Sequence, residues 1–185
     1  MRKLTLWGAF QKKQYIVNEI IAGRIFIYPT DTVYGIGCNA YTEKAVEKIF
    51  EIKKRKTNKP VSVIAPSFGW IEQNCIMDPK VRGYLPGPYT VILEKKPGCK
   101  LPSIVSNINK IGVRIPNHKF TNFISQANVP FVTTSANISG EKIPTSVYQI
   151  PEEIWDAVDY ILDDGKLSFK PSTVIDLTTD EVLRD

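Results

Sequence analysis

The sequence contains few of the residues that usually carry covalent or metal chemistry. Its single histidine, His118, follows a proline in "IPNHKF" with no nucleophile motif beside it, so a structural or surface position is predicted. The three cysteines, Cys38, Cys75 and Cys99, are widely spaced and form no CxxC pair. Such a set argues against a disulfide framework and against a zinc site, and we predict no metal held by protein ligands.

Long apolar runs and glycine-rich nucleotide motifs are also missing. No apolar run is long enough to span a bilayer, and charges interrupt the N-terminal stretch "MRKLTLWGAFQKKQYIV" before a signal-peptide core develops. We therefore predict a soluble, cytoplasmic protein without a membrane partner. The chain has no GxxxxGKS/T and no GxGxxG, so neither a P-loop nor a dinucleotide-binding fold is indicated.

Length and composition favour one domain, and positive charge gathers near its start. The 185 residues, 43% of them hydrophobic, suit a single α/β domain over 1–185. The first 59 residues hold 12 of the 24 Lys and Arg but only 5 of the 19 Asp and Glu. Five of those cations fall in "KKRKTNK", residues 53–59, which would attract phosphate on a nucleotide or on nucleic acid. A solvated helix end is the alternative interpretation, because cations also complement the helix dipole there.

Apolar periodicity predicts alternating helices and strands without a repeat or a long linker. Helices are expected over 11–22, ending at Gly23, over 42–54 with Thr42 as the N-cap, and near 120–127. Strands are expected over 25–29, 61–65, 89–94, 111–115, 131–134, 160–162 and 173–177. Because helical crossovers mix with adjacent strands, we predict a twisted mixed β-sheet flanked by helices.

Small polar residues concentrate where these strands begin or end. They occur in "YPTDTVYG" (28–35), "GVRIP" (112–116), "TTSANISG" (133–140) and "KPSTVIDL" (170–177). An ordinary turn or helix cap explains any one of these segments. Their recurrence favours a shared pocket rich in hydroxyls and cations. Such a pocket suits phosphoryl or nucleotidyl transfer, in which catalysis is mostly alignment and charge neutralisation.

Six segments of the chain also match a known family in order and approximate spacing. They are "YPTDTVYGIGCNA", "KKRKTNKP", "LPGPYTVIL", "GVRIP", "TTSANISG" and "STVIDL". Together they resemble the YrdC family of threonylcarbamoyl-AMP synthases over roughly residues 20–184. The resemblance implies a YrdC-like fold with a central basic substrate cavity. It also implies a nucleotidyltransferase that forms L-threonylcarbamoyladenylate and pyrophosphate from L-threonine, bicarbonate or carbon dioxide, and ATP.

The resemblance assigns roles to individual residues. Catalytic roles are implied for Lys53 and Arg55, which match the family's KxR pattern. The implied ATP-binding residues are Arg55, Lys59, Ser135, Asn137 and Arg184. The implied threonine-binding residues are Thr32, Arg114, Thr133 and Ser172. Asp31 would orient an amine or a magnesium-bound water, or serve as a turn residue, and Tyr28 and Tyr34 would line the pocket or belong to the core.

The implied mechanism needs no covalent enzyme intermediate. Threonine's amine would react with carbon dioxide or bicarbonate, and the resulting N-carboxylate would attack the α-phosphorus of ATP. Arg114 would hold the α-carboxylate, while Lys53 and Arg55 would offset charge at the phosphates. Magnesium is expected to accompany ATP, bound chiefly by phosphates and water. The product would pass to a separate tRNA threonylcarbamoyltransferase complex for the threonylcarbamoyladenosine modification, and weak direct tRNA binding is a further predicted interaction.

Four positions depart from the family's usual pattern. Lys56, Lys59, Ile64 and Ile143 stand where many members carry Pro, Asn, His and Ser. These departures leave open a paralogue of the same fold that uses another acyl acceptor or carbamoyl donor. The second alternative is an RNA-binding or RNA-maturation module, which "KKRKTNK" motivates. The absence of aromatic residues over 55–66 disfavours it.

Overall fold

A mixed β-sheet forms the centre of the computed structural model, which describes residues 2–55, 60–167 and 170–185. The strands are β1 (Arg2–Thr5), β2 (Phe26–Tyr28), β3 (Gly35–Gly37), β4 (Ser62–Ile64), β5 (Tyr89–Glu94), β6 (Lys110–Arg114), β7 (Phe131–Ser135), β8 (Tyr160–Asp163), β9 (Thr173–Asp176) and β10 (Glu181–Arg184). The helices are α1 (Leu6–Gln11), α2 (Lys13–Ile21), α3 (Glu43–Ile52), α4 (Phe68–Asn74), α5 (Val81–Tyr84), α6 (Thr121–Ala127), the short 3-10 helix η1 (Val147–Gln149) and α7 (Glu152–Ala157).

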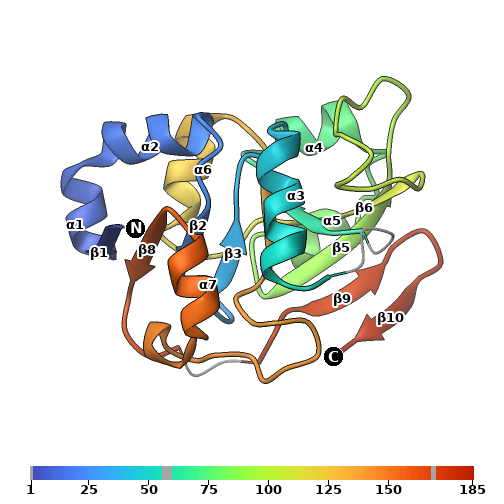
Figure 1. Cartoon of the computed structure of the whole chain (residues 1–185). Coiled ribbons are helices and arrows are strands. Elements are labelled where there is room, and N and C mark those ends of the chain that lie inside the picture. The colour runs from blue at the N-terminus through green and yellow to red at the C-terminus, as the bar shows by residue number, and fades with distance from the viewer. Residues whose placement is uncertain (1, 56–59, 168–169) are drawn as a thin grey trace.

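The ten strands lie in the order β1-β8-β2-β3-β7-β4-β6-β5-β9-β10. Pairing is parallel between β1 and β8, β2 and β8, β4 and β6, and β5 and β9, whereas the other neighbours are antiparallel. Figure 1 shows the N-terminal strand and the C-terminal hairpin at opposite ends of the sheet. The predicted mixed sheet flanked by helices is therefore confirmed.

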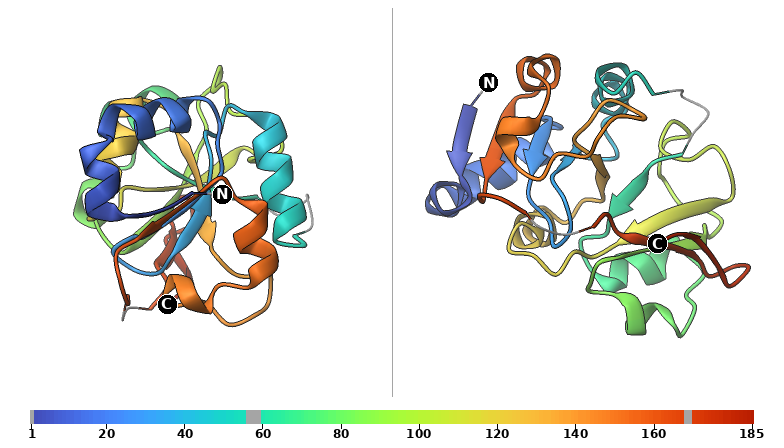
Figure 2. Two further views of the ribbon diagram at one scale, coloured as in Figure 1. Left: turned by 60° about the vertical axis from the view of Figure 1, so that its left-hand side comes forward. Right: turned by 90° about the horizontal axis from the view of Figure 1, so that it is seen from below.

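Side chains alternate between two hydrophobic clusters on the two faces of the sheet. Phe26 and Tyr28 of β2 pack in the cluster that contains α1, α2 and α6, whereas Ile27 packs in the cluster that contains α3, α4 and α7. This alternation is the two-residue period of a strand buried on both faces. Figure 2 shows α1, α2 and α6 on one side of the sheet and α3 and α7 on the other.

The seven strands expected from apolar runs are all present, with bounds that agree within one or two residues. The strands without an apolar run were not predicted. β3 has the sequence Gly-Ile-Gly, and glycine weakens a strand signal. β10 is exposed along its whole length, and β1 is exposed except at Leu4, so neither shows the alternation of a half-buried strand.

The predicted end of α2 and the predicted start of α3 are both confirmed. Gly23 follows α2 with a φ of +78°, the left-handed conformation that a glycine at a helix end adopts without strain. Thr42 is the N-cap residue of α3, as predicted, although its side chain makes no capping hydrogen bond. The Thr42 side chain lies against Gly23 instead, where an added Cβ would be 2.6 Å from its Oγ1.

Two tyrosines of the "YPTDTVYG" segment belong to the core. Tyr28 and Tyr34 are fully buried, and their hydroxyls donate to Thr133 Oγ1 at 2.7 Å and to the Gly165 carbonyl at 2.6 Å. The three cysteines are free thiols. Among the described residues, no helix is both long and apolar enough to cross a membrane.

Candidate functional site

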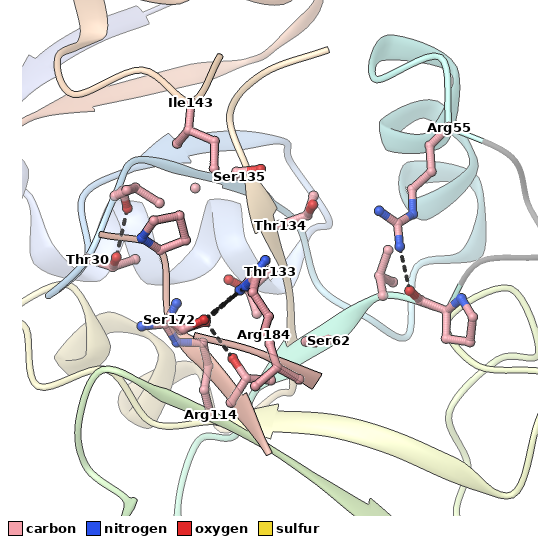
Figure 3. Close-up of a pocket in the computed structure, with 17 residues that line it drawn as sticks. Thr30, Arg55, Ser62, Arg114, Thr133, Thr134, Ser135, Ile143, Ser172 and Arg184 are labelled. Atoms are coloured by element: carbon pink, nitrogen blue, oxygen red, sulfur yellow. Dashed lines mark hydrogen bonds between the residues drawn. The ribbon is translucent and has the colours of Figure 1, made fainter. Parts of the chain in front are cut away.

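A cavity of about 210 Å³ is lined by residues of β3, β4, β5, β6, β7, β9 and β10 and of the segments that connect strands. Its polar lining consists of Thr30, Arg55, Ser62, Thr90, Arg114, Thr133, Thr134, Ser135, Ser172 and Arg184 (Figure 3). A neighbouring cavity of about 370 Å³ shares Arg55, Thr134 and Ser135 with it. The second cavity is also lined by Lys53, Lys54, Asn137, Ser139 and Gly140.

The cavity exists because small residues occupy the sheet beneath it. Ser62 of β4 pairs in register with Thr133 of β7, and Thr90 lies on β5, two strands away from β4. Between β4 and β5, Gly112 of β6 allows the strands' side chains to approach. An added Cβ at Gly112 would lie 2.4 Å from Ser62 Oγ, far inside van der Waals contact. Hydroxyls and glycine thus replace the large apolar side chains that fill the rest of the core.

The "YPTDTVYG" segment forms the loop between β2 and β3, at one wall of the cavity. Its threonine hydroxyls bond mainly to one another and to the loop backbone. Thr30 Oγ1 donates to the Val33 carbonyl at 2.7 Å and lies 2.9 Å from Thr32 Oγ1. Thr30 lines the cavity, whereas Thr32 lies behind it and accepts from Arg114 Nη2 at 3.3 Å. The loop therefore presents one hydroxyl to the cavity and uses the other to support an arginine.

Arg114, at the end of β6, is held by a buried ion pair. Its Nη2 lies 2.7 Å from Asp31 Oδ1, and the two side chains are only 7% and 10% exposed. Burial lowers the pKa of the Arg114 guanidinium, and the Asp31 charge acts in the opposite direction. Asp31 is thus the partner of a buried cation rather than only a turn residue.

Lys53 sits at the end of α3 and is 2% exposed. Its Nζ donates to the Ser135 carbonyl, to the Asn137 carbonyl at 2.6 Å, and more weakly to Asn137 Oδ1 at 3.5 Å. Burial and the nearby Arg55 lower the pKa of Lys53 to about 7. Lys53 therefore ties the end of α3 to the loop after β7.

That loop is organised around Asn137. Asn137 Oδ1 accepts from Ser135 Oγ at 2.5 Å, and its Nδ2 donates to the Glu141 carbonyl at 2.7 Å. Asn137 is buried, whereas the Ser135 side chain lies at the junction of the two cavities. The serine and asparagine of "TTSANISG" are thus one hydrogen-bonded unit, and Lys53 fixes its backbone.

Arg55 is placed by the way in which α3 ends. The Arg55 N–H donates to the Phe50 carbonyl and the Lys54 N–H to the Glu51 carbonyl, both at 2.9 Å, which closes the helix through a residue in the left-handed conformation. The Arg55 guanidinium lies 6.0 Å from the centre of the Phe50 ring, and its Nη2 donates to the Pro60 carbonyl at 2.7 Å. Both cavities have Arg55 in their lining.

Lys54 provides a stability test of this helix end. Its φ is +49°, a conformation that costs a residue with a side chain about 1 kcal/mol. We expect Lys54→Gly to be at least as stable as the wild type, because the lost ion pair with Glu153 is exposed and contributes little. Lys54→Val should lower the free energy of unfolding by about 1 kcal/mol or more, since β-branched residues resist this conformation. Urea unfolding measures both, and equal stabilities would contradict the prediction.

Ser172 and Arg184 line a further part of the main cavity. Arg184 of β10 donates through Nη2 and Nε to the Ser172 carbonyl at 2.7 and 3.1 Å, and Nη2 also reaches Ser172 Oγ at 3.1 Å. Ser172 Oγ lies 2.9 Å from Thr90 Oγ1. In Figure 3, Arg114, Arg184 and Ser172 gather together, while Arg55 projects from the end of α3.

The structure brings most of the predicted site residues together. The main cavity is lined by Arg55, Arg114, Thr133, Ser135, Ser172 and Arg184, and the second by Lys53 and Asn137. Thr32 contacts Arg114 without lining the main cavity. Lys59 and Lys56 lie outside the described residues. Of the two unusual isoleucines, Ile143 lines the cavity, whereas Ile64 is fully buried in the core.

The donor set of the cavity does not suit a magnesium ion bound by protein. Its described lining contains hydroxyls and three guanidiniums but no carboxylate, and Mg²⁺ prefers carboxylate, phosphate and water oxygens. In the parts of the chain that the structure describes, no three His, Cys, Asp or Glu side chains gather as metal ligands. His118 lies away from the cavity lining and pairs with Asp164 at 3.2 Å. Burial lowers the pKa of His118.

The site is a basic, hydroxyl-lined cavity over a mixed sheet. Known proteins resemble this chain in sequence and in fold. The family model of Sua5, YciO and YrdC, described as telomere recombination, matches residues 18–185. A relative from Methanocaldococcus jannaschii is 43% identical over 175 residues, covering 92% of this chain and 82% of its own, and bears the provisional name of a threonylcarbamoyl-AMP synthase. The threonylcarbamoyl-AMP synthase of Pyrococcus abyssi is 34% identical over 164 residues, covering 84% of this chain and 48% of its own.

A solved structure agrees with these sequence matches. The crystal structure of Pyrococcus abyssi Sua5 in complex with L-threonine superposes with a TM-score of 0.81 at 31% identity, covering 96% of this chain and 53% of that one. The chain thus spans about half the length of the Pyrococcus abyssi protein. The chain belongs to the Sua5, YciO and YrdC family, as its motifs indicated.

Proposed function

We propose that this chain is a nucleotidyltransferase that makes L-threonylcarbamoyladenylate and pyrophosphate from L-threonine, bicarbonate or carbon dioxide, and ATP. The observation that carries the proposal is the convergence of three guanidiniums, from Arg55, Arg114 and Arg184, on one cavity without a carboxylate in its described lining. Such a cavity selects anions, and this reaction brings together a carboxylate, a carbamate and a triphosphate. The names of the relatives support the same reaction.

Each guanidinium has a role in the proposed reaction. Arg114 holds the α-carboxylate of threonine, while Arg55 and Arg184 face the phosphates of ATP. Bicarbonate and the threonine amine give an N-carboxylate with loss of water. One oxygen of that carboxylate bonds to the α-phosphorus as the bond to the β-phosphate oxygen breaks and pyrophosphate leaves. No covalent enzyme intermediate is needed, and no histidine or cysteine lies in the described lining of the cavity.

Magnesium and the macromolecular partners enter the proposal through the substrates and the product. Magnesium arrives as part of the Mg–ATP substrate, bound by phosphate and water oxygens, because the described cavity offers it no carboxylate. The adenylate passes to a separate tRNA threonylcarbamoyltransferase complex, which modifies tRNA. Weak direct tRNA binding by the "KKRKTNK" segment is compatible with this scheme and is not required by it.

The proposed function is tested by incubating the purified protein with ATP, magnesium and bicarbonate, with and without L-threonine. We expect pyrophosphate release that depends on threonine, and mass analysis should identify threonylcarbamoyl-AMP. A folded protein that binds ATP but yields no such product would overturn the proposal. Product formed from another amino acid in place of threonine would identify a paralogue with a different acceptor.

Ser135→Ala provides a variant test of the site. The Ser135 hydroxyl lies where the two cavities meet and donates to Asn137 Oδ1. We expect its removal to lower kcat/KM about tenfold or more, since one misplaced polar group in such a site has effects of this size. Ser103→Ala is the matched control, because Ser103 is exposed and lines neither cavity. Equal activity in both variants would remove Ser135 from the site.

A further inference from the structure

Both carboxylate oxygens of Asp31 are already engaged. Oδ1 accepts from Arg114 Nη2 at 2.7 Å, and Oδ2 accepts from the backbone N–H of Asn117 at 2.8 Å. Asp31 lines a pocket beside the main cavity, together with Thr32 and Asn117, and is not part of the main lining. Asp31 is therefore placed to hold Arg114 in position and not to contact a substrate in the main cavity.

The guanidinium of Arg114 is only partly satisfied by the protein. Nη2 bonds to Asp31 and to Thr32 Oγ1. The buried Nε has no hydrogen-bond partner among the described residues. An unpaired buried N–H is costly unless something completes it, and Arg114 lines the cavity. The arginine is thus anchored through Nη2, and its guanidinium takes part in the wall of the cavity.

We propose that Asp31 is a positioning residue that orients Arg114 so that its guanidinium receives the carboxylate of the amino-acid substrate. This inference rests on the proposed function, because it assigns the anion at Arg114 to that substrate. Asp31 and Thr32 bond to Nη2, which fixes the plane of the guanidinium. A carboxylate in the cavity then makes a charge-assisted hydrogen bond whose direction is set before binding.

Asp31→Asn is the first test. Asparagine keeps the shape of the side chain, but it has one acceptor oxygen where aspartate has two and carries no charge. We expect KM for L-threonine to rise about tenfold or more, with KM for ATP changed by less than about threefold. Calorimetric titration with L-threonine should show the same loss of affinity.

Asp176→Asn is the matched control for a structural effect. The Asp176 side chain is also 10% exposed and pairs with Lys110 at 3.0 Å, but it lines neither cavity. Losing that ion pair should cost stability and leave KM for L-threonine unchanged. If Asp31→Asn lowers stability as Asp176→Asn does and leaves KM for L-threonine at the wild-type value, the inference is wrong.

A second pair of variants separates positioning from direct binding. Arg114→Lys removes the guanidinium edge that Asp31 orients. In that background Asp31→Asn should raise KM for L-threonine by less than about twofold, because the positioned group is already gone. Independent, multiplicative effects would overturn the inference.

Asp31→Glu is a further variant that keeps the charge. It should raise KM for L-threonine less than Asp31→Asn does, and it replaces Asp31→Asn as the test if that variant does not fold.

Failure of the inference and failure of the proposed function give different results. A wild-type protein that makes threonylcarbamoyl-AMP, beside an Asp31→Asn variant with unchanged KM for L-threonine, overturns only the role of Asp31. A folded wild-type protein that neither binds L-threonine nor makes the product overturns the proposed function and this inference with it.

Discussion

Lys53→Met is expected to destroy the activity and to destabilise the protein together. The substitution leaves the Asn137 carbonyl without the donor that Lys53 provides, whereas the Ser135 carbonyl keeps the Asn137 N–H as a donor at 2.9 Å. An unsatisfied buried carbonyl costs about 1–3 kcal/mol, partly offset because an ammonium group no longer has to be desolvated. We expect the free energy of unfolding to fall by about 1 kcal/mol or more, and the loop that follows Ser135 to lose its position. Urea unfolding and the pyrophosphate assay measure the two effects.

Lys48→Met is the control for this variant. Lys48 lies on the same helix, α3, and is exposed, so its replacement removes a charge without disturbing a buried contact. Stability and activity should both stay close to those of the wild type. A Lys53→Met protein as stable as Lys48→Met would show that the Nζ contacts contribute nothing to folding.

The lowered pKa of Lys53 adds a pH dependence to the comparison. Below about pH 7 the ammonium is charged in the folded and unfolded states, so the cost of burying its charge is fully present. Between pH 7 and the unperturbed pKa of 10.5, the unfolded chain binds a proton that the folded protein has lost. Stability contributed by this group therefore rises with pH over that range. The unfolding free energy of the wild type minus that of Lys53→Met should grow from pH 7 towards pH 10, and a constant difference would contradict this.

Arg55→Ala is expected to remove most of the activity while leaving the fold nearly intact. Arg55 lines both cavities, and its loss takes away a cation that would face the phosphates in the transition state. Removing one preorganised donor of this kind lowers kcat by about 10²–10³-fold. KM for L-threonine should change little, in contrast to Asp31→Asn, because the two arginines serve different substrates.

Arg82→Ala is the matched control for Arg55→Ala. Arg82 also lies over a phenylalanine ring, 4.7 Å from the centre of Phe68, and pairs with Glu72, but it lines neither cavity. This variant should lose the same kind of packing and keep full activity. If Arg55→Ala retains activity like Arg82→Ala, Arg55 has no role at the phosphates.

The sequence predicted the buried strands of the fold and named residues that the structure places around two neighbouring cavities, but not the direction in which their side chains point. Apolar runs such as Tyr89–Glu94 define strands because burial selects for them, whereas exposed β10 carries no such signal. The Arg114–Asp31 pair joins residues 83 positions apart and follows from pairing in the sheet, which no local pattern encodes. The basic run indicated a charged group at Lys53, but only the structure shows its ammonium directed at loop carbonyls.

The position of Arg184 has a consequence for the dynamics of the cavity. Arg184 lies on β10, an exposed edge strand that pairs only with β9 among the described strands. Edge strands of this kind open locally at a much lower free energy than core strands, and each opening would withdraw Arg184 from Ser172. An anion held by Arg184 therefore favours the closed hairpin. Amide hydrogen exchange in β10 should slow when ATP binds. The amides of the central strands exchange only when the whole protein unfolds, so their exchange rate reports global stability.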